Sequence, residues 1–131
     1  MDQKQKILAI DDESDMLLLV SSALRAEDYD VITASNGKDG LELANTEKPD
    51  AIILDVMMPE MSGFEVLEQL RLNPETQQLP VIMLTGISER SKIQSALDLG
   101  TGYYIIKPFE VSDLVGKVRV VLKEAAADPF S

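Results

Sequence analysis

The side chains able to do chemistry in this sequence are carboxylates, hydroxyls and lysines, because the 131 residues contain no cysteine and no histidine. The chain therefore offers no thiol nucleophile, no imidazole base and no thiolate or imidazole zinc ligand. Four short apolar segments each end on one or two of the remaining groups, which are Asp11 with Asp12, Asp55, Thr85 and Lys107. The chemistry to consider is that of oxygen ligands and a carboxylate nucleophile, assisted by a cation.

A shared crevice of carboxylates favours a divalent metal. Asp11, Asp12 and Asp55 would repel one another and raise each other's pKa unless a cation were bound. Ligands that offer only oxygen select Mg²⁺ or Mn²⁺ over zinc, and Mg²⁺ is usually held by one or two carboxylates with waters and a phosphate oxygen. The acidic pair can hold the metal while Asp55 attacks phosphorus and forms an acyl phosphate. Lys107 and Thr85 would then neutralise and bind the phosphoryl oxygens.

These residues can act together only if the fold gathers the ends of the strands. Asp55 ends the apolar run 51–55, which is too short for a helix and is typical of a strand buried on both faces. Five strands are predicted, at residues 7–10, 30–34, 51–55, 80–85 and 103–107. Helical spacing of apolar residues predicts helices at 14–27, from 36 onward, from 62 onward, at 88–100 and at 111–122.

Local signals support several of these helices. Ser14 or an earlier acid is available to cap the first helix, and Ser62 is a plausible N-cap for the third. Gly37 and Gly40 lie on one face of the second helix and indicate close packing against the sheet.

Strands that alternate with helices five times predict successive right-handed βαβ units and a parallel sheet, an α/β fold. In such open sheets, ligands bind beyond the carboxyl ends of the strands. Each residue also has a structural explanation. Asp11 and Asp12 could favour a helix start, Asp55 could form a turn, and Lys107 could be an exposed strand end. These explanations do not account for the gathering of all the polar strand ends at one edge of the sheet.

Composition excludes some classes of function. The formal charge of −11 argues against unaided binding to nucleic acid, because phosphate backbones are held mainly by basic patches. The polar N-terminus and the short apolar runs indicate a soluble chain with no signal peptide and no insertion into a membrane.

The combined motifs resemble the receiver domain of two-component response regulators. They are Asp11-Asp12, Asp55 followed by Met58-Pro59 and Gly63, Thr85-Gly86, and Lys107-Pro108-Phe109. The resemblance covers roughly residues 6–123. It implies a single doubly wound (βα)5 domain of flavodoxin-like type, with a five-stranded parallel sheet of order 2-1-3-4-5. The receiver is expected at 1–124, and 125–131 is expected to be a tail or the start of a linker.

The resemblance also implies roles for individual residues. Asp55 would accept a phosphoryl group from a phosphohistidine of a partner. Mg²⁺ would be held by Asp12, Asp55 and the backbone carbonyl of Met57, with Asp11 acting through water.

A second set of roles concerns the response to phosphorylation. Lys107 would pair with the phosphoryl group and could precede a cis peptide bond to Pro108. Thr85 and Tyr104 would be the switch pair, which changes the surface of the fourth helix, fifth strand and fifth helix.

By the same resemblance the chain is a regulator and not an enzyme, apart from assisting its own phosphorylation and dephosphorylation. The expected partners are a histidine kinase or histidine phosphotransfer protein and a downstream effector protein or domain, in the cytoplasm, with no direct contact to nucleic acid. The sequence is compatible with a single-domain regulator or with a receiver from a longer protein.

Two alternatives differ in function. A Mg²⁺-dependent phosphohydrolase of the haloacid-dehalogenase type also uses an aspartate nucleophile, but it needs a second aspartate two residues later, where this chain has Met57. A docking scaffold that is never phosphorylated would not need the full set Asp12, Asp55, Thr85 and Lys107.

One segment departs from the family pattern. Family members often carry alanine and acidic residues before the last strand, where this chain has Gly100-Thr101-Gly102. In the transcription-factor subfamily those acids join salt bridges of a dimer built on the fourth helix, fifth strand and fifth helix, so the departure weakens the expectation of that dimer.

Overall fold

The computed structural model of the chain describes residues 4–86 and 103–127, so the helix predicted at 88–100 lies outside the described residues. The strands are β1 (Lys6–Ile10), β2 (Asp30–Ala34), β3 (Ala51–Asp55), β4 (Val81–Gly86) and β5 (Tyr103–Lys107). The described helices are α1 (Ser14–Ala26), α2 (Gly37–Glu47), α3 (Gly63–Leu72) and α5 (Val111–Ala127). The predicted strands are confirmed, with boundaries that differ by at most one residue.

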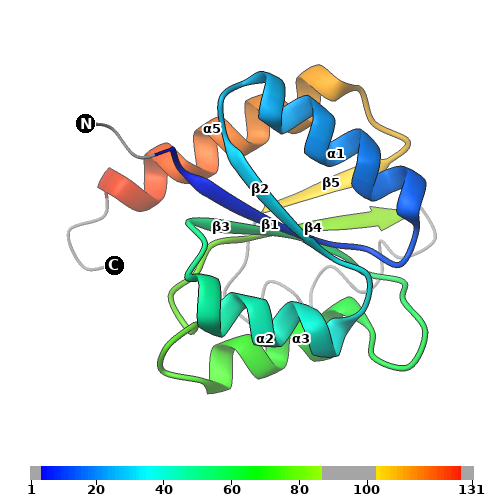
Figure 1. The fold of residues 1–131 in the computed structure, drawn as a ribbon, viewed down its shortest axis with the longest axis vertical. Helices are drawn as coiled ribbons and strands as arrows, with labels where there is room; N and C mark the ends of the chain where they lie inside the picture. Colours follow the sequence, from blue (N-terminus) through cyan, green and yellow to red (C-terminus); the bar gives the residue numbers. More distant parts are fainter. Residues whose placement is uncertain (1–3, 87–102, 128–131) are drawn as a thin grey trace.

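The five strands form one parallel sheet in the order β2-β1-β3-β4-β5. Helices α1 and α5 cover one face of this sheet, and α2 and α3 cover the other (Figure 1). The predicted α/β architecture and strand order are therefore confirmed. Because all strands run in the same direction, their carboxyl ends lie at one edge of the sheet.

The core lies in two layers, one on each face of the sheet. On the face of α1 and α5, side chains such as Ile53 and Val118 are fully buried, and on the other face Leu54 and Leu67 are. All five residues of β3 are buried, which is expected for a central strand of a parallel sheet. The strand that ends on Asp55 is therefore packed against core side chains on both faces of the sheet.

Two helices have an N-cap residue whose polar side chain accepts a hydrogen bond from the first turn. Ser62 accepts a hydrogen bond from the Glu65 N–H at the start of α3, as predicted, and Asn36 accepts one from the Asp39 N–H at the start of α2. The first helix differs, because Glu13 occupies the N-cap position and makes no capping hydrogen bond with its side chain.

No helix within the two described ranges is both long enough and apolar enough to cross a membrane.

Candidate functional site

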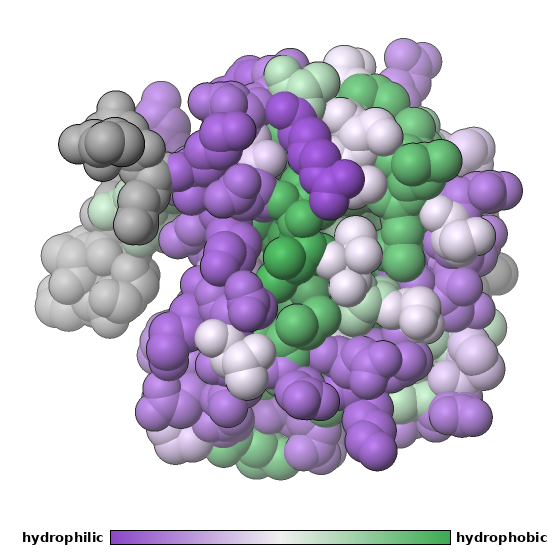
Figure 2. Space-filling view, viewed as in Figure 1, coloured by the Kyte–Doolittle hydropathy of each residue, from purple (hydrophilic) through white to green (hydrophobic). Residues whose placement is uncertain are grey.

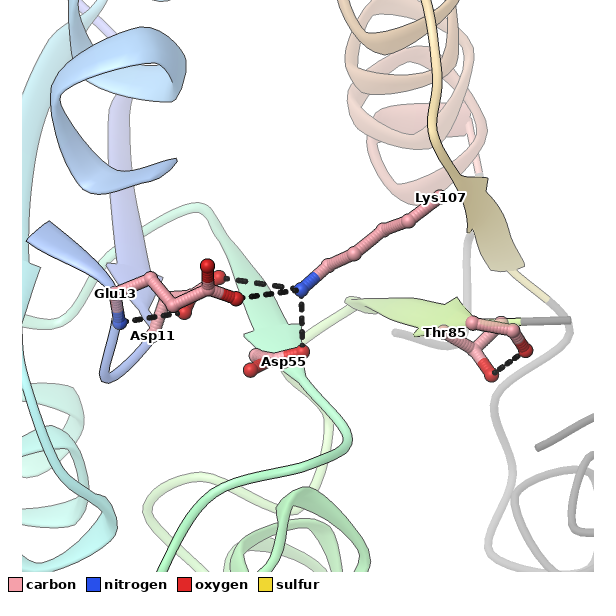
Figure 3. Close-up of polar contacts among 6 residues, drawn as sticks. Asp11, Glu13, Asp55, Thr85 and Lys107 are labelled. Carbon is pink, nitrogen blue, oxygen red and sulfur yellow. Dashed lines mark hydrogen bonds and ion pairs between the residues drawn. The ribbon is translucent and has the colours of Figure 1, made fainter. Parts of the chain in front are cut away.

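Three of the predicted residues meet at the carboxyl edge of the sheet. Asp55 is the last residue of β3, Asp11 directly follows β1, and Lys107 is the last residue of β5. Figure 3 shows the Lys107 side chain reaching across from β5, so that its ammonium lies between the carboxylates. The parallel order of the strands produces this meeting, since β3 lies between β1 and β4.

The Lys107 ammonium contacts three carboxylates. Its Nζ atom lies 2.8 Å from Asp55 Oδ1, 3.7 Å from Asp11 Oδ2 and 3.8 Å from Glu13 Oε1. The contact with Asp55 is a hydrogen bond donated by the ammonium, and it joins two side chains that are largely removed from water. A charge-assisted bond of this kind is stronger than a neutral one and holds Lys107 over the end of β3.

The environment of Asp11 disfavours its ionised form. Burial raises the pKa of Asp11 to about 6, and the nearby Asp55 charge adds to the increase, although the Glu13 N–H and the Lys107 charge oppose it. The Oδ2 atom of Asp11 is buried and has no hydrogen-bond partner among the described residues. A buried carboxylate oxygen without such a partner is costly, and a cation would relieve that cost.

Asp55 and Lys107 shift each other's pKa in opposite directions. Burial raises the pKa of Asp55 above its usual value, and the hydrogen bond and charge of Lys107 only partly offset the effect. Burial by itself would lower the pKa of Lys107, but the hydrogen bond and charge of Asp55, with the charges of Asp11 and Glu13, raise it above its usual value. Lys107 is therefore a firmly protonated cation in a crevice with excess negative charge.

The donor set fits a divalent metal that prefers oxygen. One carboxylate oxygen from each of Asp11, Asp12, Glu13 and Asp55 lies within 4.8 Å of the others. Asp11 and Asp55 are buried, whereas Asp12 and Glu13 are exposed, so the group opens to solvent on one side. The Asp11 oxygen that lacks a hydrogen-bond partner in the described ranges is the observation that makes a bound cation fit, and hard oxygen ligands favour Mg²⁺ or Mn²⁺.

The segment after Asp55 is fixed by a close backbone contact. The Gly63 N–H donates to the Val56 carbonyl at 2.9 Å, and a Cβ atom on Gly63 would lie 2.2 Å from the Asp55 carbonyl oxygen. Only glycine permits this approach, so the start of α3 lies directly against the end of β3. Met57 lies in the loop between them, with its side chain 59% exposed.

The predicted switch residues lie on neighbouring strands. Thr85 is 2% exposed, and its hydroxyl donates to the Gly86 carbonyl at 3.2 Å, away from the cluster around Lys107 (Figure 3). Tyr104 lies on β5, two residues before Ile106, which pairs in register with Thr85, and it is 40% exposed. No hydrogen bond joins Thr85 to Asp55 or to Lys107 in the described part of the chain. The peptide bond between Lys107 and Pro108 is cis.

Sequence reasoning missed the part played by Glu13. Its backbone N–H donates to Asp11 Oδ1 at 2.9 Å, and its carboxylate approaches Lys107. The only signal available was a third acid directly after Asp11 and Asp12, and acidic residues are common near helix starts for other reasons.

Comparison with known proteins identifies the family and the fold. Residues 7–119 match the family model of the response regulator receiver domain. The chain is 40% identical over 121 residues to the alkaline phosphatase synthesis transcriptional regulatory protein PhoP of Bacillus subtilis, covering 92% of this chain and 50% of that protein. It is 36% identical over 126 residues to the phosphate regulon transcriptional regulatory protein PhoB of Rhizobium meliloti, covering 96% and 56%.

Solved structures agree with these relatives. The chemotaxis protein CheY4 of Vibrio cholerae superposes with a TM-score of 0.86 at 33% identity, covering 91% of this chain and 99% of that one. The chain spans about half the length of the PhoP and PhoB relatives.

Proposed function

Because this chain belongs to the response regulator receiver domain family, we propose that it is a phosphorylation-dependent switch whose phosphoacceptor is Asp55. The observation that carries the proposal is the buried Asp55 carboxylate at the end of β3, which accepts a hydrogen bond from Lys107 at 2.8 Å. It lies beside the buried Asp11 oxygen that has no hydrogen-bond partner among the described residues. A buried nucleophile, a cation and free oxygen ligands in one crevice are what phosphoryl transfer to a carboxylate requires.

In the proposed reaction, one Asp55 oxygen forms a bond to phosphorus while the bond from phosphorus to the donor's histidine nitrogen breaks. The leaving imidazole keeps the electron pair and takes up a proton, and Asp55 becomes an acyl phosphate. Lys107 then exchanges its hydrogen bond to the Asp55 carboxylate for one to a phosphoryl oxygen. Its raised pKa keeps it charged throughout, so it stabilises the negative charge that arrives with phosphate.

Asp11, Asp12, Asp55 and the backbone carbonyl of Met57 would hold Mg²⁺, with Mn²⁺ as a substitute. When bound, the ion would neutralise charge on the phosphoryl oxygens. Asp11 and Asp55 are already buried and in place, so these carboxylates would need little rearrangement to bind it.

The phosphoryl donor would be a histidine kinase or a histidine phosphotransfer protein, and the output would be an effector protein or domain. PhoP and PhoB are named as transcriptional regulatory proteins, which supports an effector of that broad kind. The chain belongs to a family of regulators, and we propose that its own residues assist its phosphorylation and dephosphorylation. We propose that the receiver expected at residues 1–124 works in the cytoplasm. Its last helix, α5, continues to Ala127, beyond the boundary at which a tail or linker was expected.

The proposed function is tested by incubating the protein with a small acyl phosphate and measuring its intact mass. With Mg²⁺ the chain should gain one phosphoryl group, and with a chelator the gain should be at least about tenfold slower, because the crowded carboxylates then repel the donor. A protein that gains no mass under either condition, or one that steadily releases inorganic phosphate from a generic phosphomonoester, would contradict the proposal. The second result would favour the phosphohydrolase.

Asp11→Asn should have opposite effects on the metal-free and metal-bound protein. The raised pKa of Asp11 means that folding disfavours its charged form at pH 7, so neutralisation should raise the unfolding free energy of the metal-free protein by about 1–3 kcal/mol. Mg²⁺ at a hundred times its Kd should stabilise the wild type by about 2.7 kcal/mol, and this gain should shrink in the variant.

Chemical denaturation with and without Mg²⁺ measures both effects. Asp15→Asn is the matched control, since Asp15 is exposed on α1 and should change neither quantity by more than about 0.5 kcal/mol. Loss of stability in metal-free Asp11→Asn would show that the ionised carboxylate contributes to the fold.

Thr85→Ala should leave phosphorylation of Asp55 intact but block the structural change that follows it. The phosphoryl group adds acceptor oxygens, and the Thr85 hydroxyl, which donates to the Gly86 carbonyl, can turn to meet them. Movement of Thr85 would leave space beside β5 that the half-exposed Tyr104 ring could fill. The two arrangements of Thr85 and Tyr104 need differ in free energy by only a few kcal/mol for phosphorylation to shift their populations.

The variant should accept phosphate on Asp55 but lose the amide NMR shifts near Tyr104 and Lys117. Thr33→Ala, on the far edge of the sheet, is the control and should keep them. Undiminished shifts in Thr85→Ala would show that another route carries the signal.

A further inference from the structure

Four carboxylates gather around the phosphoacceptor in the described part of the chain, and the proposed reaction uses only three of them. Asp11, Asp12 and Asp55 would hold the metal, and Asp55 would also carry the phosphoryl group. Glu13 contributes an oxygen to the same group, within 4.8 Å of the other three, but the reaction gives it no role. The effect of its charge on the site has to be considered separately.

The structure fixes the backbone of Glu13 and gives its side chain a contact with Lys107. The Glu13 N–H donates to Asp11 Oδ1 at 2.9 Å, and its carbonyl accepts from the Leu17 N–H at 3.1 Å. Glu13 is the N-cap residue of α1, yet its side chain makes no capping hydrogen bond. Figure 3 shows Glu13 and Lys107 reaching toward each other from opposite sides, with Oε1 3.8 Å from Nζ. The carboxylate thus contacts Lys107 and does not cap its own helix.

Lys107 has to bring its positive charge to the phosphoryl group in the proposed reaction. Three carboxylates share that charge in the resting structure, those of Asp55, Asp11 and Glu13. Phosphorylation converts the Asp55 carboxylate into an acyl group, and Asp11 would be engaged with the metal. Of the four described carboxylates, Glu13 alone is then left to compete with the phosphoryl group for the ammonium.

We propose that Glu13 is a positioning residue that draws Lys107 away from the phosphoryl group and so limits the rate at which Asp55 is phosphorylated. This inference rests on the proposed function, because it concerns the step in which Lys107 meets the phosphoryl group. The Glu13 side chain is 64% exposed, so its attraction for Lys107 is that of a partly solvated ion pair. A pair of this kind changes the rate by about two- to fivefold.

The acidity of the whole chain does not produce the same effect. The sequence has 23 acidic and 12 basic residues, and hydrophilic residues surround a central apolar strip on the face seen in Figure 2. Long-range repulsion of an anionic donor is therefore shared by many carboxylates, and about 0.15 M salt screens it beyond about 8 Å. Removal of one negative charge should matter only where its carboxylate contacts the cation of the crevice, which is the case for Glu13.

The test compares the rates at which the wild type and Glu13→Gln gain mass from a small acyl phosphate. Glutamine keeps the length of the side chain and removes its charge, and saturating Mg²⁺ makes the rate insensitive to any change in metal affinity. The variant should be phosphorylated about two- to fivefold faster than the wild type.

Glu27→Gln is the matched control, because it makes the same change directly after α1 instead of directly before it. Glu27 also contacts a cation, with its Oε1 3.2 Å from Arg119 Nη2, but this ion pair lies away from Asp55. The control should be phosphorylated at the wild-type rate. Circular dichroism should show that all variants fold.

A double-mutant cycle shows whether Glu13 acts through Lys107. In the Lys107→Met background the ammonium is absent, so Glu13→Gln should change the rate by less than about 1.5-fold. The same cycle applied to unfolding without metal detects the ion pair in the resting protein. There, the effects of Glu13→Gln on the unfolding equilibrium constant should differ by about two- to fivefold between the two backgrounds.

Salt provides a readout that a purely structural role of Glu13 would not change. At about 1 M salt the Debye length is about 3 Å, so a partly exposed ion pair is strongly screened. The faster phosphorylation of Glu13→Gln should therefore approach the wild-type rate as the salt concentration rises.

The possible outcomes separate this inference from the proposed function. A wild type that gains no mass would overturn both. A wild type that gains mass no more slowly than Glu13→Gln would overturn this inference alone. An equal acceleration in the Lys107→Met background would do the same, because Glu13 would then act directly on the donor, and so would an acceleration that persists at high salt or unfolding effects that are equal in the two backgrounds.

Discussion

Asp55→Asn should abolish phosphoryl incorporation, lowering it by at least about hundredfold while the fold is retained. An amide has nearly the shape of a carboxylate, but it lacks the negative oxygen that attacks phosphorus. Because burial raises the pKa of Asp55, its charged form is disfavoured in the metal-free fold, so the variant should be at least as stable as the wild type. Intact mass after incubation with Mg²⁺ and a small acyl phosphate measures incorporation, and thermal unfolding without metal measures stability.

The control for Asp55→Asn lies next to the opposite end of the same strand. Asp50 is exposed directly before β3, at the opposite end from Asp55, and accepts a hydrogen bond from the Lys6 N–H that an asparagine can also accept. Asp50→Asn should therefore be phosphorylated at the wild-type rate. Equal mass gain in Asp55→Asn and the wild type would mean that another side chain is the acceptor.

Lys107→Met should slow phosphorylation by about 10- to 100-fold, the loss expected for one charge-assisted hydrogen bond worth about 1.5–3 kcal/mol. The methionine keeps much of the length of the side chain and removes only the cation. Without it, Asp11, Asp55 and Glu13 face one another with no positive partner among the described residues, so the pKa of Asp55 should rise further. The metal-free variant should also lose stability, and Mg²⁺ should recover more of it than in the wild type.

Time courses of intact mass at a fixed Mg²⁺ concentration measure the rate. Lys123→Met is the matched control, because Lys123 is exposed near the end of α5 and makes no ion pair within the described ranges. It should leave the rate unchanged. If Lys107→Met were phosphorylated as fast as this control, Lys107 would serve only to neutralise the resting carboxylates.

The architecture could be predicted from the sequence because each strand is a short apolar run and each described helix has an apolar stripe. Once the strands are parallel, topology alone brings Asp11, Asp55 and Lys107 to one edge, and the structure confirms that they meet. Thr85 was predicted to end its strand, and the strand continues one residue further to Gly86.

Contacts that depend on the reach of a side chain could not be predicted. The exposed Glu13 carboxylate lies 3.8 Å from the Lys107 ammonium, and Arg71 donates to the Leu79 carbonyl at 2.9 Å across the loop before β4. Arg25 likewise donates to the Val31 carbonyl of β2 at 3.0 Å. Each of these contacts joins a long flexible side chain to a group fixed by the fold, and neither spacing nor periodicity encodes such a pair.

The central claim is that the phosphoryl group is carried by the Asp55 carboxylate. Its most direct test is to phosphorylate the wild type, reduce the product with borohydride, digest it and sequence the peptides by tandem mass spectrometry. Reduction converts an aspartyl phosphate to homoserine, so homoserine should replace aspartate at position 55 and at no other acidic residue. Homoserine at Asp11 or Asp12 with Asp55 intact, the five-carbon alcohol of a reduced glutamyl phosphate at Glu13, or phosphate that survives reduction on a hydroxyl, would contradict the claim.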